Sequence, residues 1–440
     1  MWKKITKVVL FLLIFILLFL GASKVLNSTG DYRSAQWIGG FYKEPARSLD
    51  AVYVGSSTCY AYWNPLYAWE NYGIAVYPYT CNSQHFIAAE YLIREVRKTQ
   101  PDALFIVNTN TIEENRMVVE KYHDLLDCMP FSINKLRLTK YLCDISGFSA
   151  RESLELYVPL YRFHSRWSEL NSSDFYYPLN GLKGTSNYST YKNTFTDISQ
   201  LYTHADGFSP LPDYIAEAAE SLMDYCEAEG VRIVFVTVPR VESRLRLEEI
   251  NTLNAMLEDR GFDTLKLMDQ TDLLKLDLTQ DFYNKGHTNI HGSLKYTAYL
   301  SEYLIERYGL EDRRGDPSCA SWDEGVRKYA KSMQTYTLDI ERDVSRRTPE
   351  LPRPDDLEIT AGPDGINISW APVSGADGYL VYQRPQGKVW TLLADVAETQ
   401  FSLAPDKGKT TDDYTVVPYC GSGDGRLYGE FDYCCSHAED

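Results

Sequence analysis

The sequence predicts an α/β domain with a parallel sheet, preceded by a membrane anchor and followed by a smaller all-β sandwich. Between residues 50 and 309, short apolar runs alternate with amphipathic helical segments, as in parallel sheets covered on both faces. From residue 352 to 436, apolar and polar residues alternate between turns, which is typical of a β-sandwich. Residues 1–26 begin with basic residues and continue as an almost entirely apolar run.

Five short apolar runs are expected to form the parallel sheet. They lie at Ala51–Val54, Ile74–Tyr77, Ala103–Val107, Val231–Val238 and Thr264–Met268. The two clearest helices are Ser83–Thr99, with apolar residues at helical spacing, and Pro212–Glu229, with a proline suited to a first turn. Active sites of open parallel sheets lie at the carboxyl ends of the strands, so functional residues are expected directly after these runs.

A long insertion, from about residue 110 to 205, interrupts the alternation. Such insertions often form lids and substrate walls. His164 and Arg166, beside Trp167, are therefore candidates for binding a sugar or a carboxylate, although a structured helix with a solvated cation is the more frequent explanation of such residues. Residues 27–49 are expected to be a polar connector, and residues 310–351 a charged, helical linker.

Composition excludes some classes of function. The formal net charge of -17 argues against nucleic-acid binding, because a phosphate backbone needs a basic surface. No phosphate-binding loop or dinucleotide fingerprint occurs, and no cysteine spacing resembles a zinc site, so neither a cofactor nor a metal is expected. The nine cysteines leave at least one unpaired; most are expected to be small buried residues, and a bridge between Cys59 and Cys81 stays open.

The amino terminus is expected to be an uncleaved signal anchor. Lys3, Lys4 and Lys7 precede an apolar run at 8–22, and this charge places the amino terminus in the cytoplasm and the bulk of the chain outside the cell. A cleaved signal peptide is the alternative, with small residues at 21–23 near a cut. The length of the apolar run favours the anchor, and hence a single-pass protein of the cell membrane.

The carboxy-terminal segment closely resembles a fibronectin type III domain. The matching residues are Trp370 on the second strand, residues 376–382 on the third, and Tyr414 with Tyr419 late in the fold. The resemblance covers almost all of residues 352–436. It implies a module that spaces or binds, with Trp370 as a core residue and not a sugar-stacking one.

A serine and a histidine carry the chemical hypothesis. Ser57 follows the first strand on a tight Gly-Ser-Ser turn, where it is placed to attack, and His287 near the end of the same domain can take its proton. A third side chain should orient the imidazole. Asp281, six residues before the histidine, is the first candidate, and Asn284, three residues before it, is the alternative. A Ser-His dyad also remains open.

An oxyanion hole is expected at the same strand ends. Its donors are the backbone N–H of Ser57, a backbone N–H near Ser83, and an amide side chain from Asn108 or Asn110.

These segments make residues 50–309 resemble the SGNH (GDSL-like) hydrolase family, in its divergent membrane-anchored, surface-acting branch. The family's first block, Gly-Asp-Ser, matches Gly55-Ser56-Ser57 and makes Ser57 the nucleophile. Its last block, Asp-x-x-His with a following Asn and Gly, matches Asn284, His287, Asn289 and Gly292. The resemblance implies a flavodoxin-like three-layer fold with esterase, deacetylase or acyltransferase chemistry, and it makes Asn289 a candidate substrate-binding residue.

Departures from the family pattern leave two functions open. Ser56 replaces the aspartate of the first block, Ser83 stands where a glycine is usual, and Asn284 stands where an aspartate is usual. The first hypothesis is an extracellular, membrane-anchored serine esterase or O-acyltransferase that acts on acyl groups of cell-envelope or extracellular glycans; a membrane partner that donates the acyl group is compatible with it. The alternative is a catalytically decayed envelope protein with a binding or assembly role.

Overall fold

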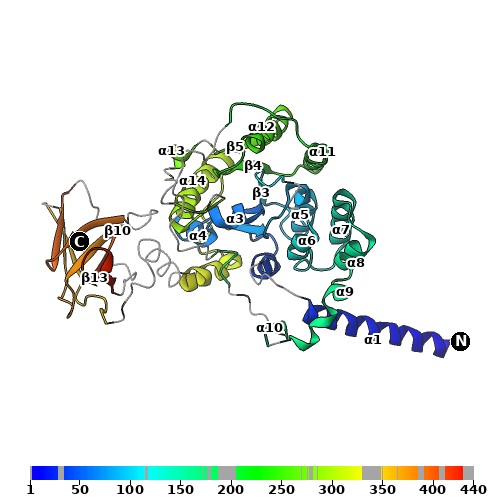
Figure 1. Ribbon diagram of the computed structural model, residues 1–440, viewed down its shortest axis with the longest axis horizontal. Helices are drawn as coiled ribbons and strands as arrows, with labels where there is room; N and C mark the ends of the chain where they lie inside the picture. Colours follow the sequence, from blue (N-terminus) through cyan, green and yellow to red (C-terminus); the bar gives the residue numbers. More distant parts are fainter. Residues whose placement is uncertain are drawn as a thin grey trace.

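The computed structural model describes most of the chain from Trp2 to Gly429 (Figure 1). The residues outside this description are 1, 28–33, 114–116, 171, 176–178, 180, 187–204, 269, 275, 277–280, 285, 330–347, 349, 364, 385–390, 406–411 and 430–440. The described parts are an amino-terminal helix, an α/β domain and a carboxy-terminal pair of antiparallel sheets.

A five-stranded parallel sheet forms the centre of the α/β domain, as the alternation of apolar runs and helical segments predicts. Its strands lie in the order β2-β1-β3-β4-β5, one of the two common doubly wound orders. Their bounds are Ala51–Gly55 (β1), Val76–Thr80 (β2), Leu104–Asn108 (β3), Ile233–Thr237 (β4) and Asp263–Lys266 (β5). Strand β2 begins two residues later than expected, because Gly73 takes a positive φ at the end of the preceding helix and the chain first has to reach the sheet.

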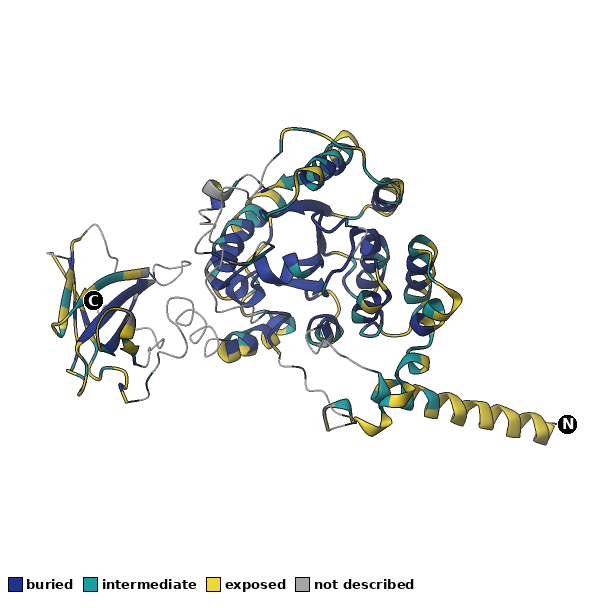
Figure 2. Cartoon of the chain, in the orientation of Figure 1, coloured by how far each residue is buried: buried dark blue, intermediate teal, exposed yellow. Residues whose placement is uncertain are grey.

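Helices cover both faces of this sheet, since alternate residues of each strand point to opposite sides. Val52 and Val54 of β1 pack into one core with helices from Ala89–Val96 (α5), Asp213–Glu229 (α11) and Arg244–Asp259 (α12). The neighbouring Ala51 and Tyr53 pack into a second core with Ser57–Tyr62 (α3) and Ile290–Tyr308 (α14). Figure 2 shows the buried sheet enclosed by these half-exposed helices.

One expected helix is shorter than the periodicity predicts. The segment expected as Ser83–Thr99 contains a 3-10 turn at Phe86–Ala88 and helix α5 at Ala89–Val96. Ser83 has a φ of 55° and cannot belong to a right-handed helix, and the side chain of His85 caps the 3-10 turn. Helix α11 matches its expected range except that Pro212 precedes the first helical residue.

The regular elements that the structure describes in the insertion are all helical. Its elements are Val119–Leu126 (α6), Ile133–Ser146 (α7), Ala150–Tyr157 (α8), Pro159–Phe163 (α9), a 3-10 segment at His164–Ser168 (η4), and Ser172–Phe175 (α10). Helix α7 packs against α5, while α9, η4 and α10 contact the amino-terminal helix. The insertion therefore connects the domain to that helix.

Segments expected as connectors also contribute to the α/β core. Trp37, in a π-helical turn at Ala35–Gly39, is buried and stacks on Tyr60 with ring centroids 3.8 Å apart. Residues 320–329 form a helix, and its fully buried Trp322 packs 5.7 Å from Trp69. The packed body thus extends beyond residues 50–309 at both ends.

The remaining elements of the α/β domain are short and lie near its edges. They are Pro65–Tyr72 (α4), Thr271–Leu274 (α13), the two-stranded hairpin Phe282–Asn284 (β6) and His287–Thr288 (β7), and the 3-10 turn Pro317–Cys319 (η5).

Two antiparallel sheets form the carboxy-terminal part. Strands β11-β10-β13-β14 make one sheet and β12-β9-β8 make the other. Their bounds are Glu358–Gly362 (β8), Gly365–Ser369 (β9), Gly378–Arg384 (β10), Thr391–Val396 (β11), Gln400–Leu403 (β12), Asp413–Cys420 (β13) and Leu427–Tyr428 (β14), with a 3-10 turn at Gly423–Gly425 (η7). Residues of both sheets share one core that contains the buried Trp370, which confirms its expected core position.

The amino-terminal helix, Trp2–Leu26 (α1), is exposed along most of its length (Figure 2). Its segment Lys4–Leu26 has 23 residues and a mean hydropathy of 2.8, which is long and apolar enough to cross a membrane. It is the only such helix in the part of the chain that the structure describes.

Candidate active site

Ser57 lies just after the carboxyl end of β1, an interior strand of the sheet. Gly55 ends the strand, Ser56 caps helix α3 in an extended conformation, and Ser57 is the first helical residue. A Cβ atom at Gly55 would overlap the Cys59 sulfur and lie 2.8 Å from Asn108 Cβ, so only glycine fits there. The tight turn places Ser57 at the carboxyl ends of the strands, where ligands bind in doubly wound folds.

The β6–β7 hairpin brings His287 to this serine. The hydroxyl of Thr288 donates to the Ala61 carbonyl at 2.6 Å, and Ser293 on α14 donates to the Tyr62 carbonyl at 3.1 Å. These bonds fix the hairpin and α14 against helix α3. His287 Nε2 consequently lies 2.7 Å from Ser57 Oγ, although 230 residues separate them.

Asn284 determines the tautomer of the histidine. Its Oδ1 atom lies 2.8 Å from His287 Nδ1 and also accepts the backbone N–H of Gly286 at 2.9 Å. A backbone N–H can only donate, so the amide presents its oxygen to both partners. Nδ1 must then carry the proton, which leaves Nε2 as the acceptor for the Ser57 hydroxyl. The imidazole is thereby held in the form that a general base requires.

Asp281, the first candidate for orienting the histidine, has a different partner. Its buried carboxylate forms an ion pair with Lys295 of α14 at 2.7 Å, and its carbonyl accepts the N–H of Asn289 at 2.8 Å. The structure places Asn284, the alternative, on the imidazole. Asp281 instead holds the hairpin to the start of α14.

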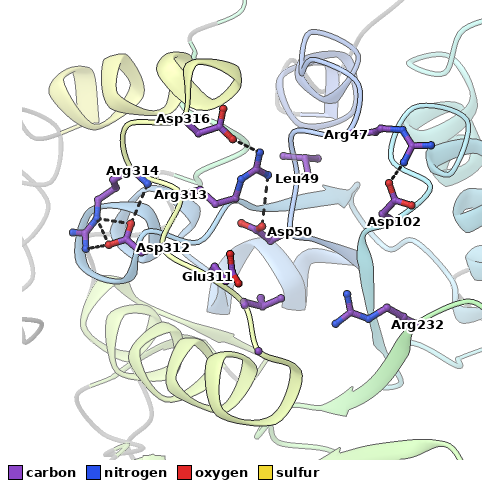
Figure 3. Close-up of a pocket in the computed structure, with 12 residues that line it drawn as sticks. Arg47, Leu49, Asp50, Asp102, Arg232, Glu311, Asp312, Arg313, Arg314 and Asp316 are labelled. Carbon is purple, nitrogen blue, oxygen red and sulfur yellow. Dashed lines mark hydrogen bonds and ion pairs between the residues drawn. The ribbon is translucent and has the colours of Figure 1, made fainter.

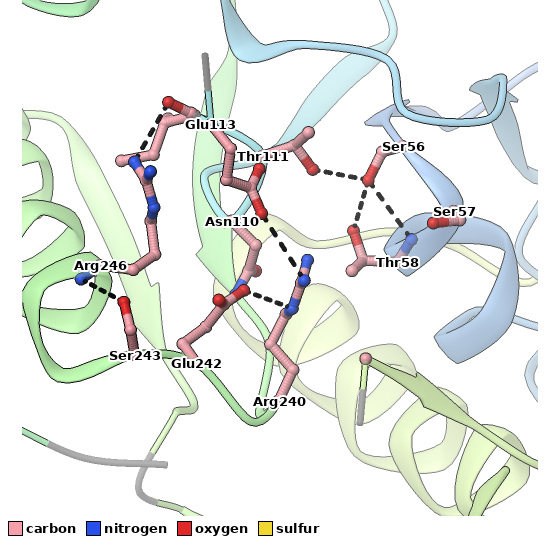
Figure 4. A network of polar contacts seen from close by, with 12 residues as sticks. Ser56, Ser57, Thr58, Asn110, Thr111, Glu113, Arg240, Glu242, Ser243 and Arg246 are labelled. Carbon is pink, nitrogen blue, oxygen red and sulfur yellow. Dashed lines mark hydrogen bonds and ion pairs between the residues drawn. The ribbon is translucent and has the colours of Figure 1, made fainter. Parts of the chain in front are cut away.

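Ser56 occupies the position of the first-block aspartate and joins a buried hydroxyl network (Figure 4). Its Oγ lies 2.6 Å from Thr111 Oγ1 and 3.1 Å from Thr58 Oγ1. Thr58 in turn donates to Asn108 Oδ1 at 3.0 Å. This network connects the serine turn to the loop after β3.

The side chains of Asn108 and Asn110 are not directed to a substrate, which corrects the expectation that one of them serves the oxyanion hole. Both are buried. The Asn108 amide donates to Asn110 Oδ1 at 2.8 Å and to the Val236 carbonyl at 3.4 Å. The Asn110 amide donates to the Val238 carbonyl at 3.0 Å and contacts Met268 Sδ at 3.4 Å. Each amide uses both of its N–H groups inside the protein.

The turn that contains Ser83 adjoins the turn that carries Ser57. The Thr80 hydroxyl donates to the Ser56 carbonyl at 2.8 Å, and the Tyr60 hydroxyl donates to Asn82 Oδ1, so the turn after β2 is bonded to the residues around Ser57. Ser83 is buried and has a φ of 55°, a conformation that glycine adopts without strain. Its backbone therefore follows the path expected of a glycine at that position.

His164 and Arg166 lie on η4, beside the amino-terminal helix. His164 is exposed and its Nδ1 lies 2.8 Å from the Tyr161 carbonyl. Arg166 donates to the Leu26 carbonyl at 2.8 Å and pairs with Asp174 at 2.8 Å. Arg166 thus binds the end of α1, where a substrate contact was expected.

Asn289 also has a structural role where a substrate contact was expected. It is fully buried and caps helix α14, accepting the N–H of Gly292 at 3.2 Å. The capping bond fixes the start of the helix three residues after His287.

A group of charged residues near the site was not anticipated from the sequence (Figure 4). Arg240, which follows β4, pairs with Glu242 at 2.7 Å and approaches Glu113 at 3.7 Å. A Cβ at Gly286 would lie 3.5 Å from the Arg240 guanidinium, which places this cation against the turn before His287. The sequence offered one sign of a role for Arg240, namely its position shortly after a strand, where functional residues of such sheets lie.

A concave region lies at the amino-terminal ends of the strands, opposite the ends that carry Ser57 (Figure 3). It measures about 600 Å³ and includes Asp50, Asp102 and Arg232, which precede β1, β3 and β4. Arg313 lies 3.6 Å from Asp50 and 2.6 Å from Asp316. Burial raises the pKa of Asp50 to about 6, against the opposing effects of the Ala75 N–H and Arg313. These charges are largely paired and lie far from the strand ends that carry Ser57.

The cysteines and possible metal ligands add no further chemistry. Seven described cysteines, including Cys59 and Cys81, are not assigned to disulfides, and most are buried as expected. Among the described residues, no cluster of three or more His, Cys, Asp or Glu side chains is arranged to hold a metal ion. Cys434 and Cys435 lie outside the described residues.

Comparison with known proteins assigns no family. No family model matches the chain, and no curated protein matches it. The geometry of Ser57, His287 and Asn284 is therefore the basis of the proposed function.

Proposed function

We propose that the protein is a membrane-anchored serine hydrolase or O-acyltransferase of the SGNH type that acts outside the cell on acyl groups of glycans. The observation that carries the proposal is the 2.7 Å contact between Ser57 Oγ and His287 Nε2, with Asn284 fixing the tautomer. A hydroxyl needs an adjacent base to become a nucleophile near neutral pH. This contact supplies the base in the correct protonation state.

The reaction divides into two half-reactions. His287 Nε2 accepts the Ser57 proton as Oγ attacks the acyl carbonyl, and the departing sugar alcohol then takes that proton, leaving an acyl-serine. In the second half, water or an acceptor hydroxyl loses a proton to Nε2 and attacks the acyl-serine. The tetrahedral intermediate collapses, and the same proton returns to Ser57 Oγ. Water gives an esterase, and a sugar hydroxyl gives a transferase.

Backbone N–H groups are the proposed oxyanion donors. The N–H of Ser57 stands at the first turn of α3, where an intrahelical acceptor is absent by geometry. The glycine-like turn at Ser83 is bonded to the same serine turn and supplies the second N–H. In this proposal the amides of Asn108 and Asn110 do not contact the oxyanion. They hold the loops after β3 and β4 together beside the oxyanion donors.

The 2-1-3-4-5 strand order and the order of the two motifs along the chain support the SGNH assignment within this proposal. The carboxy-terminal sheets fit a fibronectin type III module in the same proposal. In this proposal α1 is the anchor and holds the active domain at the outer face of the membrane, where envelope or extracellular glycans and a membrane-bound acyl donor are accessible; its apolar length and the basic residues before it support this.

A decayed, binding-only protein is the second candidate. Two observations favour it: the neutral amide of Asn284 cannot offset the charge of an imidazolium as a carboxylate does, and both amides after β3 are bonded internally. A binding fold, however, has no need of a serine that donates to a tautomerically fixed histidine.

Labelling with a fluorophosphonate probe separates the two candidates. The full-length protein in detergent should be labelled on Ser57, as located by peptide mapping, and His287→Ala should lose the label. The matched control His164→Ala removes an exposed histidine away from the site and should be labelled like the wild type. Absence of label on the folded wild type, beside an active serine esterase that is labelled, would overturn the enzymatic proposal.

A further inference from the structure

The last turns of helix α1 pack against the protein on one face. Phe19, Ala22, Ser23 and Leu26 recur at helical spacing and are half-buried, with Val25 beside them, whereas nearly all earlier residues of the helix are exposed. The packed face begins where the apolar run at 8–22 is ending. At 1.5 Å per residue, the stretch from Phe19 to Leu26 covers about 10 Å along the helix axis.

The packing partner is the insertion. Elements α9, η4 and α10 contact α1. Arg166 donates to the Leu26 carbonyl at 2.8 Å, and its guanidinium is held in place by the nearly buried carboxylate of Asp174. A cation on a terminal carbonyl is the favourable arrangement at a helix carboxyl end. The α/β domain is thus joined to the membrane helix by a packed contact as well as by the chain at residues 28–33.

Each of these three elements also exposes a large aromatic side chain. Tyr161 on α9 is 46% exposed, Trp167 on η4 is 72% exposed, and Phe175 on α10 is 65% exposed. We call this set the aromatic surface. Aromatic side chains are enriched at the membrane–water interface, where the ring contacts lipid and any polar group meets the headgroups.

We propose that the aromatic surface lies in the headgroup layer of the outer leaflet and seats the α/β domain directly on the bilayer. Lipid is the expected partner of the aromatic surface because this surface is continuous with α1. The same elements that expose the rings pack against the membrane helix within about 10 Å of the point where it leaves the hydrocarbon. Lys24 is exposed at this level, as expected of a basic residue at a lipid headgroup. This inference is independent of the chemistry of Ser57.

Tryptophan quenching by brominated lipid tests the proposal on the full-length protein. The protein is placed in nanodiscs of phosphatidylcholine with or without bromine near the headgroup end of the acyl chains. Because the chain has eight tryptophans, the contribution of Trp167 is obtained by subtracting the emission of Trp167→Phe. Trp167 is exposed, so this variant should fold, and its emission component should be mostly lost in the brominated discs.

The control moves the fluorophore away from the membrane helix. In the double variant Trp167→Phe/Phe208→Trp, the new tryptophan replaces a 67% exposed ring just before α11, which lies on the other side of the domain from α1 in Figure 1. Its emission should be the same in both kinds of disc. If the Trp167 component were not quenched, the proposal would be overturned. This result is also the one expected if a second copy of the chain, and not lipid, covers the aromatic surface.

Discussion

Replacing Asn284 by aspartate should accelerate the proposed reaction. Asn284 Oδ1 contacts His287 Nδ1 at 2.8 Å, so a carboxylate in the same place would accept the same bond and add a negative charge beside the imidazolium that forms in the transition state. The N–H of Gly286, 2.9 Å from that oxygen, would keep the new side chain in register. The substitution changes one neutral acceptor into an ionised one and little else.

The expected size follows from the two kinds of hydrogen bond. A neutral bond contributes about 1 kcal/mol and one to a charged group about 1.5–3 kcal/mol, so the gain is about 0.5–2 kcal/mol. Since roughly 1.4 kcal/mol corresponds to tenfold, kcat/KM should rise by about 2- to 30-fold. Asn284→Ala should lower kcat/KM by about fivefold, because it removes the neutral bond and frees the tautomer.

Hydrolysis of a small acyl ester measures these changes, at a pH of about 8 so that histidines begin neutral. Thermal unfolding of each variant confirms the fold. Asp281→Asn is the matched comparison, since Asp281 pairs with Lys295, and it should cost less rate per folded molecule than Asn284→Ala. The reasoning is refuted if folded Asn284→Asp is no faster than the wild type, or if Asp281→Asn costs more than Asn284→Ala.

Three further predictions concern stability and are measured by thermal or denaturant unfolding. Gly55→Ala should lower the free energy of unfolding by about 1–3 kcal/mol, because its methyl would overlap Cys59; an unchanged value would contradict the packing. Ser83→Val should destabilise by about 1–2 kcal/mol and Ser83→Gly should not, since φ is 55° there; equal effects would argue against that conformation. Burial raises the pKa of Asp50 from 3.8 to about 6, so the folded state binds this proton more tightly than the unfolded chain. Asp50 therefore contributes its full stabilisation below a pH of about 4. The free energy of unfolding falls by about 3 kcal/mol as the pH rises through about 6 and the folded-state carboxyl loses its proton. Asp50→Asn should remove that decline, and a variant with the pH profile of the wild type would disprove it.

Much of the α/β sheet and the pairing of Ser57 with His287 could be predicted because both depend on local patterns. Apolar runs of strand length set β1 and β3 to within one residue. Functional residues in such sheets gather at the carboxyl ends of the strands. The order of the two motifs along the chain was therefore enough to predict that the serine and the histidine lie close together.

The partners of the remaining polar residues depended on long-range packing that no local pattern encodes. The amide of Asn110 is bonded to Val238 and Met268, which follow other strands more than a hundred residues away along the chain. Arg166 meets the Leu26 carbonyl across 140 residues. The shortened α5 region has a different cause, because the positive φ of Ser83 belongs to a turn that helical periodicity cannot reveal.

The distance along the chain between Ser57 and His287 has a consequence for biogenesis. Closing a loop of 230 residues costs about 5 kcal/mol of chain entropy, far more than the single hydrogen bond between the two side chains can offset. The packing of α14 on α3 must therefore assemble the pair. In the proposed function, a chain that emerges amino-terminus first presents its serine long before its histidine, so the nucleophile becomes competent only when the whole α/β domain has folded.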